Sequence, residues 1–141
     1  SKTFTNTANE GKGFFTKFSD KIPLYLPGEI MLIKAECAAR KNDLVTAVAE
    51  LNNVLTKSAD IYGVNANLPA YAGPVTQADV LQEIYRNRCI ELYNSGLKLE
   101  DSRRFGRPGP NDAGAERSRN FYPYPTTERD NNPNTPADPT I

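Results

Sequence analysis

Apolar residues recur at helical spacing in three stretches of the chain, which predicts three amphipathic helices. The first helix is expected from about Pro27 or Gly28 to Lys41, and Pro27 suits its start because proline is well tolerated at the first helical position. Glu36 and Arg40 stand four residues apart and should form an ion pair along the helix. Ile30, Ile33 and Cys37 lie on one face of this helix, with Met31, Ala35 and Ala38 beside them, so the expected apolar stripe is wide.

The second helix is expected over about residues 44–57. Its apolar stripe consists of Leu44, Val48, Leu51 and Leu55. Asn42 and Asp43 should end the first helix and cap the second. A short turn between two amphipathic helices predicts a helical hairpin.

The predicted hairpin resembles a tetratricopeptide repeat in the spacing of its small residues. The matching positions are Ala35 and Ala38 on the first helix and Ala47 and Leu51 on the second. The usual aromatic residue and Leu-Gly pair of that repeat are missing. One repeat cannot bury both of its faces, so later helices, or sequence outside this chain, should cover the hairpin.

A third helix is predicted to start at Thr76, because Thr76 and Asp79 form an approximate capping box. Its apolar residues at helical spacing are Leu81, Ile84, Tyr85, Cys89 and Leu92. Gly96 should end or kink this helix. A short fourth helix is expected over about residues 97–105, stopped by the Gly/Pro cluster that begins at Gly106.

The expected fold is therefore all-α: a tetratricopeptide-like helical hairpin plus further helices, with long irregular N- and C-terminal arms. The N-terminal arm, residues 1–26, carries three phenylalanines that could pin it to the helices, Phe14, Phe15 and Phe18. From Asn111 onward the chain is polar and Pro-rich, and its apolar content is concentrated in the FYPYP run at 121–125. A length of 141 residues suits a single domain.

Composition excludes several function classes. Lysine plus arginine and aspartate plus glutamate number 17 each, so no global field attracts nucleic acid. The absence of histidine removes the His-based triad, the usual general base and the commonest zinc ligand. No stretch is apolar enough to span a bilayer. Cys37 and Cys89 are expected to be free buried thiols, with a single disulfide as the alternative.

A charged cluster in the segment ELYNSGLKLEDSRRFGRPGP, residues 91–110, is the strongest candidate for chemistry. Catalysis by paired carboxylates needs one carboxyl group with a raised pKa, whereas arginines on the next turn would lower the pKa of these acids. We therefore expect no catalytic residue and no metal ligand here. The cluster is predicted to be a structural ion-pair network of Arg88, Glu91, Asp101, Arg103 and Arg104.

Tyrosines are the candidates for ligand contact, because an exposed aromatic ring offers a flat apolar face and its hydroxyl a polar group. Tyr62 and Tyr71 lie in a predicted loop, residues 58–75, where binding residues tend to occur. The alternative is that they pack this loop onto the helices. Tyr122 and Tyr124 are expected to anchor the C-terminal tail.

Three segments of the chain match the pattern of one known family, in the right order. The first is FTKFSDKIPLYLPGEIMLIKAECAARKND, in which Glu29, Leu32, Ala35 and Glu36 fall on that pattern. The second, RNRCIELYNSGLKLEDSRRFG, matches E-R-x-x-E-L-x-x-E-G-x-R-x-x-D-L-R-R-x-G at Arg88, Glu91, Leu92, Gly96, Asp101, Arg103, Arg104 and Gly106. The third, YPYPTTERDNNPN, follows P-x-P-x-x-E-x-x-x-N-P-N. Departures from the second pattern are Asn87, Ser95, Lys98 and Ser102.

These segments, over about residues 17–134, resemble the C-terminal part of the SusD/RagB family of outer-membrane nutrient-binding lipoproteins. The resemblance implies a non-enzymatic protein without a cofactor, which binds a nutrient and works with a SusC-like TonB-dependent transporter. The family captures glycans or peptides, and an oligosaccharide or polysaccharide such as starch is the ligand expected here. It also implies a lipid anchor at the cell surface through an N-terminal segment that this chain does not include. Most ligand contacts of the family lie in earlier portions. The alternative is a helical-repeat protein–protein interaction module without a small ligand.

Overall fold

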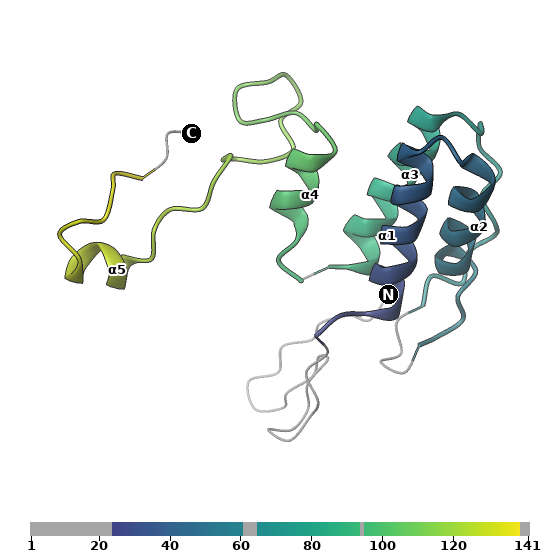
Figure 1. Cartoon of the computed structure of the whole chain (residues 1–141), viewed down its shortest axis with the longest axis horizontal. Coiled ribbons are helices and arrows are strands. Elements are labelled where there is room, and N and C mark those ends of the chain that lie inside the picture. The colour runs from purple at the N-terminus through teal and green to yellow at the C-terminus, as the bar shows by residue number, and fades with distance from the viewer. Residues whose placement is uncertain (1–23, 61–64, 94, 139–141) are drawn as a thin grey trace. The chain divides into compact units, whose positions relative to one another are not determined.

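The structure is a computed structural model that describes residues 24–60, 65–93 and 95–138. These residues form five helices and no strand (Figure 1), so the predicted all-α class is confirmed. The helices are α1 (Pro27–Arg40), α2 (Leu44–Leu55), α3 (Gln77–Glu91), α4 (Lys98–Arg104) and α5 (Thr126–Asn131). The chain divides into two compact units, Ser1–Leu92 and Tyr93–Ile141. The N-terminal phenylalanines lie outside the described residues.

In the first unit, α1 and α2 form the predicted hairpin, and α3 packs against both (Figure 1). Asn42 makes the turn between α1 and α2 with a positive φ of 62°, a conformation that asparagine tolerates better than most residues. The core between the helices contains the fully buried side chains of Leu32, Leu51, Val54, Val80 and Ile84. Burial of each such aliphatic side chain contributes about 1.5–3 kcal/mol to folding.

Capping residues fix where α2 and α3 begin. The side chain of Asp43 accepts a hydrogen bond from the backbone N–H of Thr46 at 3.2 Å. The hydroxyl of Thr76 accepts one from the N–H of Asp79 at 3.2 Å, as the capping box predicted. Gln77 in turn donates its amide to the carbonyl of Ala39 at 2.8 Å, which satisfies a backbone oxygen at the end of α1.

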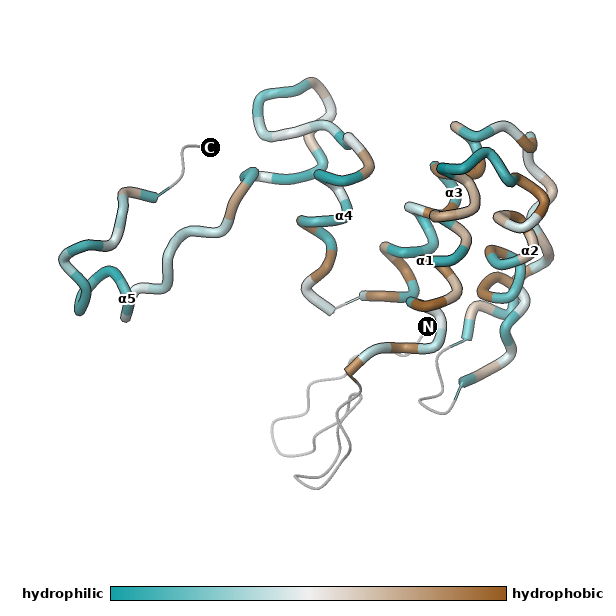
Figure 2. Tube along the Cα trace, in the orientation of Figure 1, coloured by the Kyte–Doolittle hydropathy of each residue, from teal (hydrophilic) through white to brown (hydrophobic). Residues whose placement is uncertain are grey.

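Only part of the apolar stripe predicted for α1 is buried: Ala35 and Ala38 face the core, whereas the side with Ile30, Ile33 and Cys37 does not. Ile30 and Ile33 keep 43% and 41% of their surface exposed, and Cys37 is exposed. The buried positions are Gly28, Leu32, Ala35, Glu36, Ala38 and Ala39. Small alanines let two helices approach closely, so the alanine side of α1 faces the core and the side with the larger apolar residues does not. Figure 2 shows that hydrophobic and hydrophilic positions alternate along α1.

The predicted buried state of the thiols was accordingly wrong for Cys37. Cys89 is only partly buried, and both cysteines are free, so the alternative of a disulfide is not realised. The alanines and leucine that suggested a tetratricopeptide-like crossing are all buried: Ala35, Ala38, Ala47 and Leu51. The repeat-like character of the hairpin itself stays a prediction.

Two helices end earlier than expected. The second helix stops at Leu55 rather than near Lys57, and the hydroxyl of Thr56 donates back to the carbonyl of Asn52 at 2.8 Å. The third helix stops at Glu91, well before Gly96. Gly96 has a φ of +83°, which glycine adopts without strain, and it belongs to the turn that precedes α4.

In the second unit, α4 forms close to its predicted position. Gly106, with a φ of +63°, ends it. The N–H groups of Gly106 and Arg107 donate to the carbonyls of Arg103 at 3.0 Å and Ser102 at 2.8 Å. A glycine in the left-handed region beyond the last turn is a common helix C-terminus.

The short helix α5 lies in the arm that was predicted to be irregular, and that prediction was wrong for these residues. Pro125 precedes it with a φ of −54°, and the N–H groups of Glu128 and Arg129 donate to the Pro125 carbonyl at 3.0 and 3.1 Å. No residue of α5 is buried. It is therefore a locally bonded turn of helix, which apolar periodicity cannot detect.

Candidate functional site

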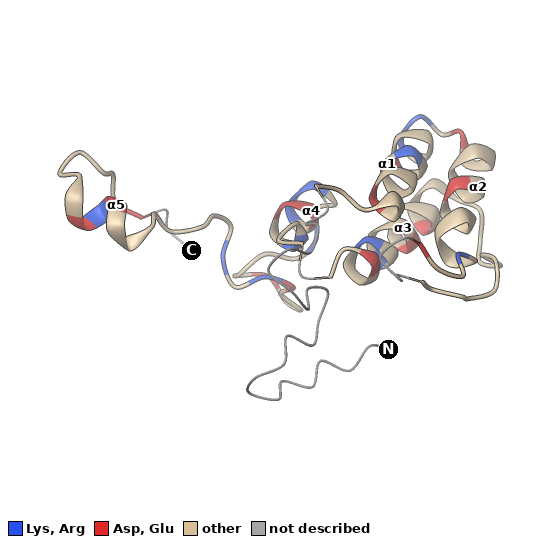
Figure 3. Ribbon diagram, turned by 90° about the horizontal axis from the view of Figure 1, so that it is seen from below, with Lys and Arg blue, Asp and Glu red and all other residues tan. Residues whose placement is uncertain are grey.

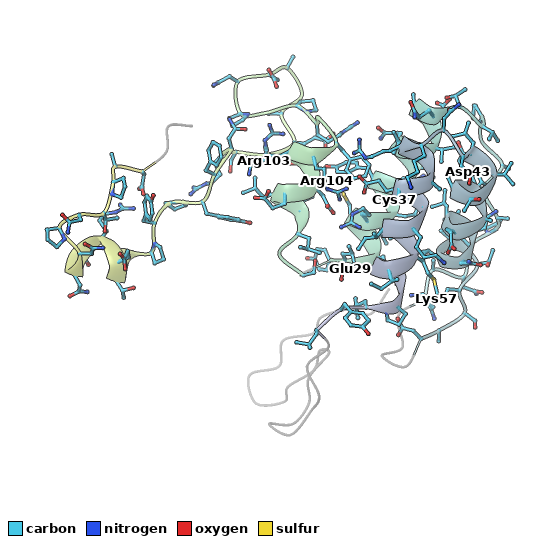
Figure 4. The ribbon with its side chains drawn as sticks, in the orientation of Figure 1. Glu29, Cys37, Asp43, Lys57, Arg103 and Arg104 are labelled. Carbon is cyan, nitrogen blue, oxygen red and sulfur yellow. The ribbon has the colours of Figure 1, made fainter. Side chains whose placement is uncertain are left out.

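Each of the two units contains ion pairs among the charged residues that the sequence singled out. In the first unit, Lys57 forms ion pairs with Glu91 and, at 3.3 Å, with Asp60. The exposed fractions of these side chains are only 9% for Lys57, 4% for Glu91 and 5% for Asp60. We call Lys57, Asp60 and Glu91 the helix-end ion cluster, because Lys57 follows α2 and Glu91 is the last residue of α3 (Figure 4 labels Lys57).

The start of α1 also meets this cluster. A Cβ atom added to Gly28 would overlap the Glu91 carboxylate and lie 2.6 Å from Glu91 Cγ. Only glycine therefore lets the carboxylate approach the first turn of α1. That end of a helix carries partial positive charge, which favours a nearby carboxylate. The cluster thus brings together the start of α1, the segment after α2 and the end of α3.

This arrangement favours a structural role over catalysis. The Glu91 carboxylate is buried, binds Lys57 through one oxygen and packs against the start of α1. General acid–base chemistry instead requires a carboxyl group within hydrogen-bond reach of a substrate. Arg88, one turn before Glu91 on α3, is buried as well.

In the second unit, the charged residues of α4 pair along their own helix. Arg104 donates to Asp101 at 2.7 Å, and Arg103 donates to both carboxylate oxygens of Glu100 at 3.1 Å. The Arg103 guanidinium also lies over the Phe121 ring, 4.5 Å from its centroid. A network that joins all five predicted residues, Arg88, Glu91, Asp101, Arg103 and Arg104, stays a prediction.

Sequence reasoning missed Lys57, Asp60 and Gly28. Lys57 lies 34 residues from Glu91, so no local spacing connects them. Gly28 was interpreted only as part of a helix start beside Pro27. The one available signal was a glycine in the first turn of a predicted helix, directly after Pro27, where the helix itself does not require glycine.

Tyr71 is held firmly in the loop that precedes α3. Its N–H donates to the side-chain oxygen of Asn52 at 2.7 Å, and its hydroxyl donates to the carbonyl of Pro74 at 2.9 Å. Burial raises the pKa of the Tyr71 hydroxyl, and the negative charges of Asp79 and Glu83 raise it further. The Tyr71 hydroxyl therefore keeps its proton to a higher pH than an ordinary tyrosine does. Tyr62 lies outside the described residues.

No group of three or more histidine, cysteine, aspartate or glutamate side chains among the described residues is arranged to hold a metal ion. In the same part of the chain, no helix combines the length and apolar character needed to cross a membrane. Lysine and arginine are interspersed with acidic residues on α1, α3, α4 and α5 (Figure 3), and the described residues form no basic stripe of the kind that nucleic-acid binding uses.

Comparison with known proteins assigns the chain to a family. The family model described as the SusD family matches residues 2–139. The chain therefore belongs to the SusD family, as the three motif segments predicted. Membership indicates binding of glycans or other nutrients at the outer membrane, and the family is in general not enzymatic. Comparisons with curated proteins and with solved structures give no significant match.

Proposed function

We propose that this chain is the C-terminal helical part of a longer lipoprotein that captures glycans at the cell surface. The complete protein hands its ligand to a SusC-like TonB-dependent transporter in the outer membrane, and a lipid anchor upstream of residue 1 holds it there. The observation that carries this proposal is the family match over residues 2–139. The order of the three motif segments within that range supports it.

The charged side chains fit a scaffold rather than an enzyme. The helix-end ion cluster and the Asp101–Arg104 pair tie up the acids that would otherwise be the candidates for acid–base chemistry. In this proposal the chain supplies a rigid helical base, and most ligand contacts come from the upstream portion.

Tyr62 and Tyr71 remain our proposed ligand-contacting residues in the first unit. The hydrogen bonds of Tyr71 to Asn52 and Pro74 hold its ring in one position, which lowers the entropy lost when a sugar stacks on it. Tyr71 is only partly buried. The alternative role, packing of the loop onto α2, uses the same hydrogen bond to Asn52.

A helical interaction module without a small ligand is the second candidate. The observation that favours it is the exposed apolar side of α1, formed by Ile30, Ile33 and Cys37. Further repeats of about 34 residues upstream, without a lipoprotein signal, would support this alternative. An upstream lipoprotein signal and a neighbouring transporter gene would support the glycan-capture protein.

Co-purification tests the proposed partnership. The complete parent protein would be extracted from membranes in mild detergent and isolated through an affinity tag, and the bound proteins would be identified by mass spectrometry. We expect a TonB-dependent barrel as a stoichiometric partner. Recovery of the parent protein without any barrel, in the soluble fraction of the cell, would contradict the proposal.

A further inference from the structure

The segment between α4 and α5 presents two exposed tyrosines. Tyr122 keeps 62% of its surface exposed and Tyr124 keeps 38%. We propose that this tyrosine pair, Tyr122 and Tyr124, is a stacking platform for an uncharged oligosaccharide. The inference rests on the proposed function, because it assigns part of the glycan contact to this chain.

Prolines fix the backbone under the tyrosine pair. Tyr122 precedes Pro123 and Tyr124 precedes Pro125, and a residue before proline is restricted to extended or polyproline conformations. Pro125 itself has φ −54° and ψ 141°, which lies in the polyproline region. With a rise of about 3.1 Å per residue, the two tyrosine Cα atoms are separated by about 6 Å. The backbone that carries the two rings therefore loses little freedom on binding.

Contacts on both sides hold this segment in place. On one side, Phe121 lies under the guanidinium of Arg103, which Glu100 binds in turn. On the other side, Asp138 accepts the N–H of Tyr124 at 3.0 Å, and Arg129 donates to the carbonyl of Tyr124 at 3.2 Å. The backbone of Tyr124 is thus fixed by hydrogen bonds while its ring stays partly exposed.

The same contacts argue against a peptide that binds as an added strand. Strand addition needs a row of available backbone N–H and C=O groups. Pro123 and Pro125 have no N–H, and the N–H and carbonyl of Tyr124 are already bonded. The Pro125 carbonyl accepts from α5. What the segment offers to a ligand is therefore its rings and hydroxyls.

The charges on the segment around the tyrosine pair favour an uncharged ligand. Residues 120–138 contain a single arginine and three acidic residues, and that arginine, Arg129, donates to Asp138 at 2.6 Å. A surface for nucleic acid or an anionic polysaccharide requires an excess of lysine and arginine. Aromatic faces with hydroxyl groups and no excess of positive charge suit a neutral sugar, whose apolar ring faces stack while its hydroxyls form hydrogen bonds.

Affinity electrophoresis of the whole 141-residue chain tests the platform, with soluble starch, dextran or galactomannan in the gel. The test variant is Y122A/Y124A, and Y25A removes an equally exposed tyrosine from the first unit as the matched control. We expect at least one gel to retard the wild-type chain. The double alanine variant should bind about tenfold more weakly, whereas Y25A should behave as wild type. Circular dichroism checks that the variants keep their helices.

A second variant separates the rings from the hydroxyl groups. Y122F/Y124F keeps both rings, so it should retain most of the retardation, and the loss should appear only with alanine. Dextran sulfate in the gel should not retard the chain. Stronger retardation by this anionic polymer than by the neutral ones would overturn the choice of ligand.

The remaining outcomes distinguish this inference from the proposed function. If Y122A/Y124A is retarded as strongly as wild type, the platform is wrong and the function stands. If the complete parent protein is retarded and this chain is not, the platform is again wrong, because the site lies upstream. If neither protein is retarded in any gel, both proposals are contradicted.

Discussion

Lys57 and Glu91 form a buried ion pair across 34 positions of the sequence. The pair joins the segment after α2 to the last residue of α3, and Glu91 also packs against Gly28 in the first turn of α1. Three helices therefore meet at one group of charges. Such a pair holds helices in register, and it is costly to break because one charge would stay buried without its partner.

Replacement of Lys57 tests how much the helix-end ion cluster contributes to stability. Lys57→Met keeps most of the side-chain volume and removes the charge that faces Glu91 and Asp60. We expect the free energy of unfolding to fall by about 3 kcal/mol, the usual magnitude when one partner of a buried pair is lost. Urea denaturation followed by circular dichroism measures it.

Lys34→Met is the matched control. Lys34 pairs with Glu50, but its side chain is 59% exposed, so water screens the interaction. The loss should stay below about 1 kcal/mol. Equal effects of the two lysine variants would show that the buried cluster has no special role in stability.

Gly28→Ala should destabilise the first unit, because the new Cβ would overlap the Glu91 carboxylate. We expect a loss of about 1–3 kcal/mol, typical of an overpacked site. The double variant G28A/E91A removes the overlap, so its loss should be smaller than the sum of the two single losses. Strict additivity in urea denaturation would mean that the two residues do not touch.

Asp43 predicts a defined pH dependence at the start of α2. Its hydrogen bonds with Thr46 lower the pKa of the carboxyl below the ordinary value of 3.8. A lowered pKa in the folded state means that the charged carboxylate stabilises the fold at any pH above 3.8, and that this contribution is lost as the pH falls through the lowered value. As the pH falls through this acidic range, the urea concentration at the midpoint of unfolding should therefore decrease more for the wild type than for D43N.

The comparison with D43N isolates the charge, because asparagine still caps a helix. If the urea midpoints of the wild type and D43N change in parallel over the whole acidic range, the role given to the carboxylate is contradicted. D43A, which has no capping group, should be less stable than both at neutral pH.

Thiol labelling checks the corrected face of α1. Cys37 is exposed and Cys89 is partly buried, so a thiol reagent such as DTNB should modify the folded chain in a fast and a slow step. The fast step should disappear in C37S and the slow step in C89S. Slow modification of Cys37 would contradict its exposure and restore the prediction that this thiol is buried.

Local signals explain what the sequence predicted well. The starts of α2 and α3 depend on Asp43 and Thr76, whose capping bonds reach only three residues along the chain. The end of α4 depends on Gly106 in the same way. Helix existence and the family motifs could be read from such short patterns.

Contacts between helices explain what could not be predicted from the sequence. The side of α1 that faces the core depends on how closely α2 and α3 approach, and the alanine side permits the closer approach. Lys57 and Gly28 acquire their roles only when the helix ends meet at Glu91. The helix α5 buries nothing and forms through local hydrogen bonds after Pro125, so it leaves no apolar pattern in the sequence.

We propose that the complete protein captures glycans, with this chain as its helical base. Affinity electrophoresis of the parent protein through gels that contain neutral polysaccharides tests it most directly. We predict clear retardation by at least one of them and none in a gel without polysaccharide. Unretarded migration of the parent protein in every gel would contradict glycan capture and favour the helical interaction module.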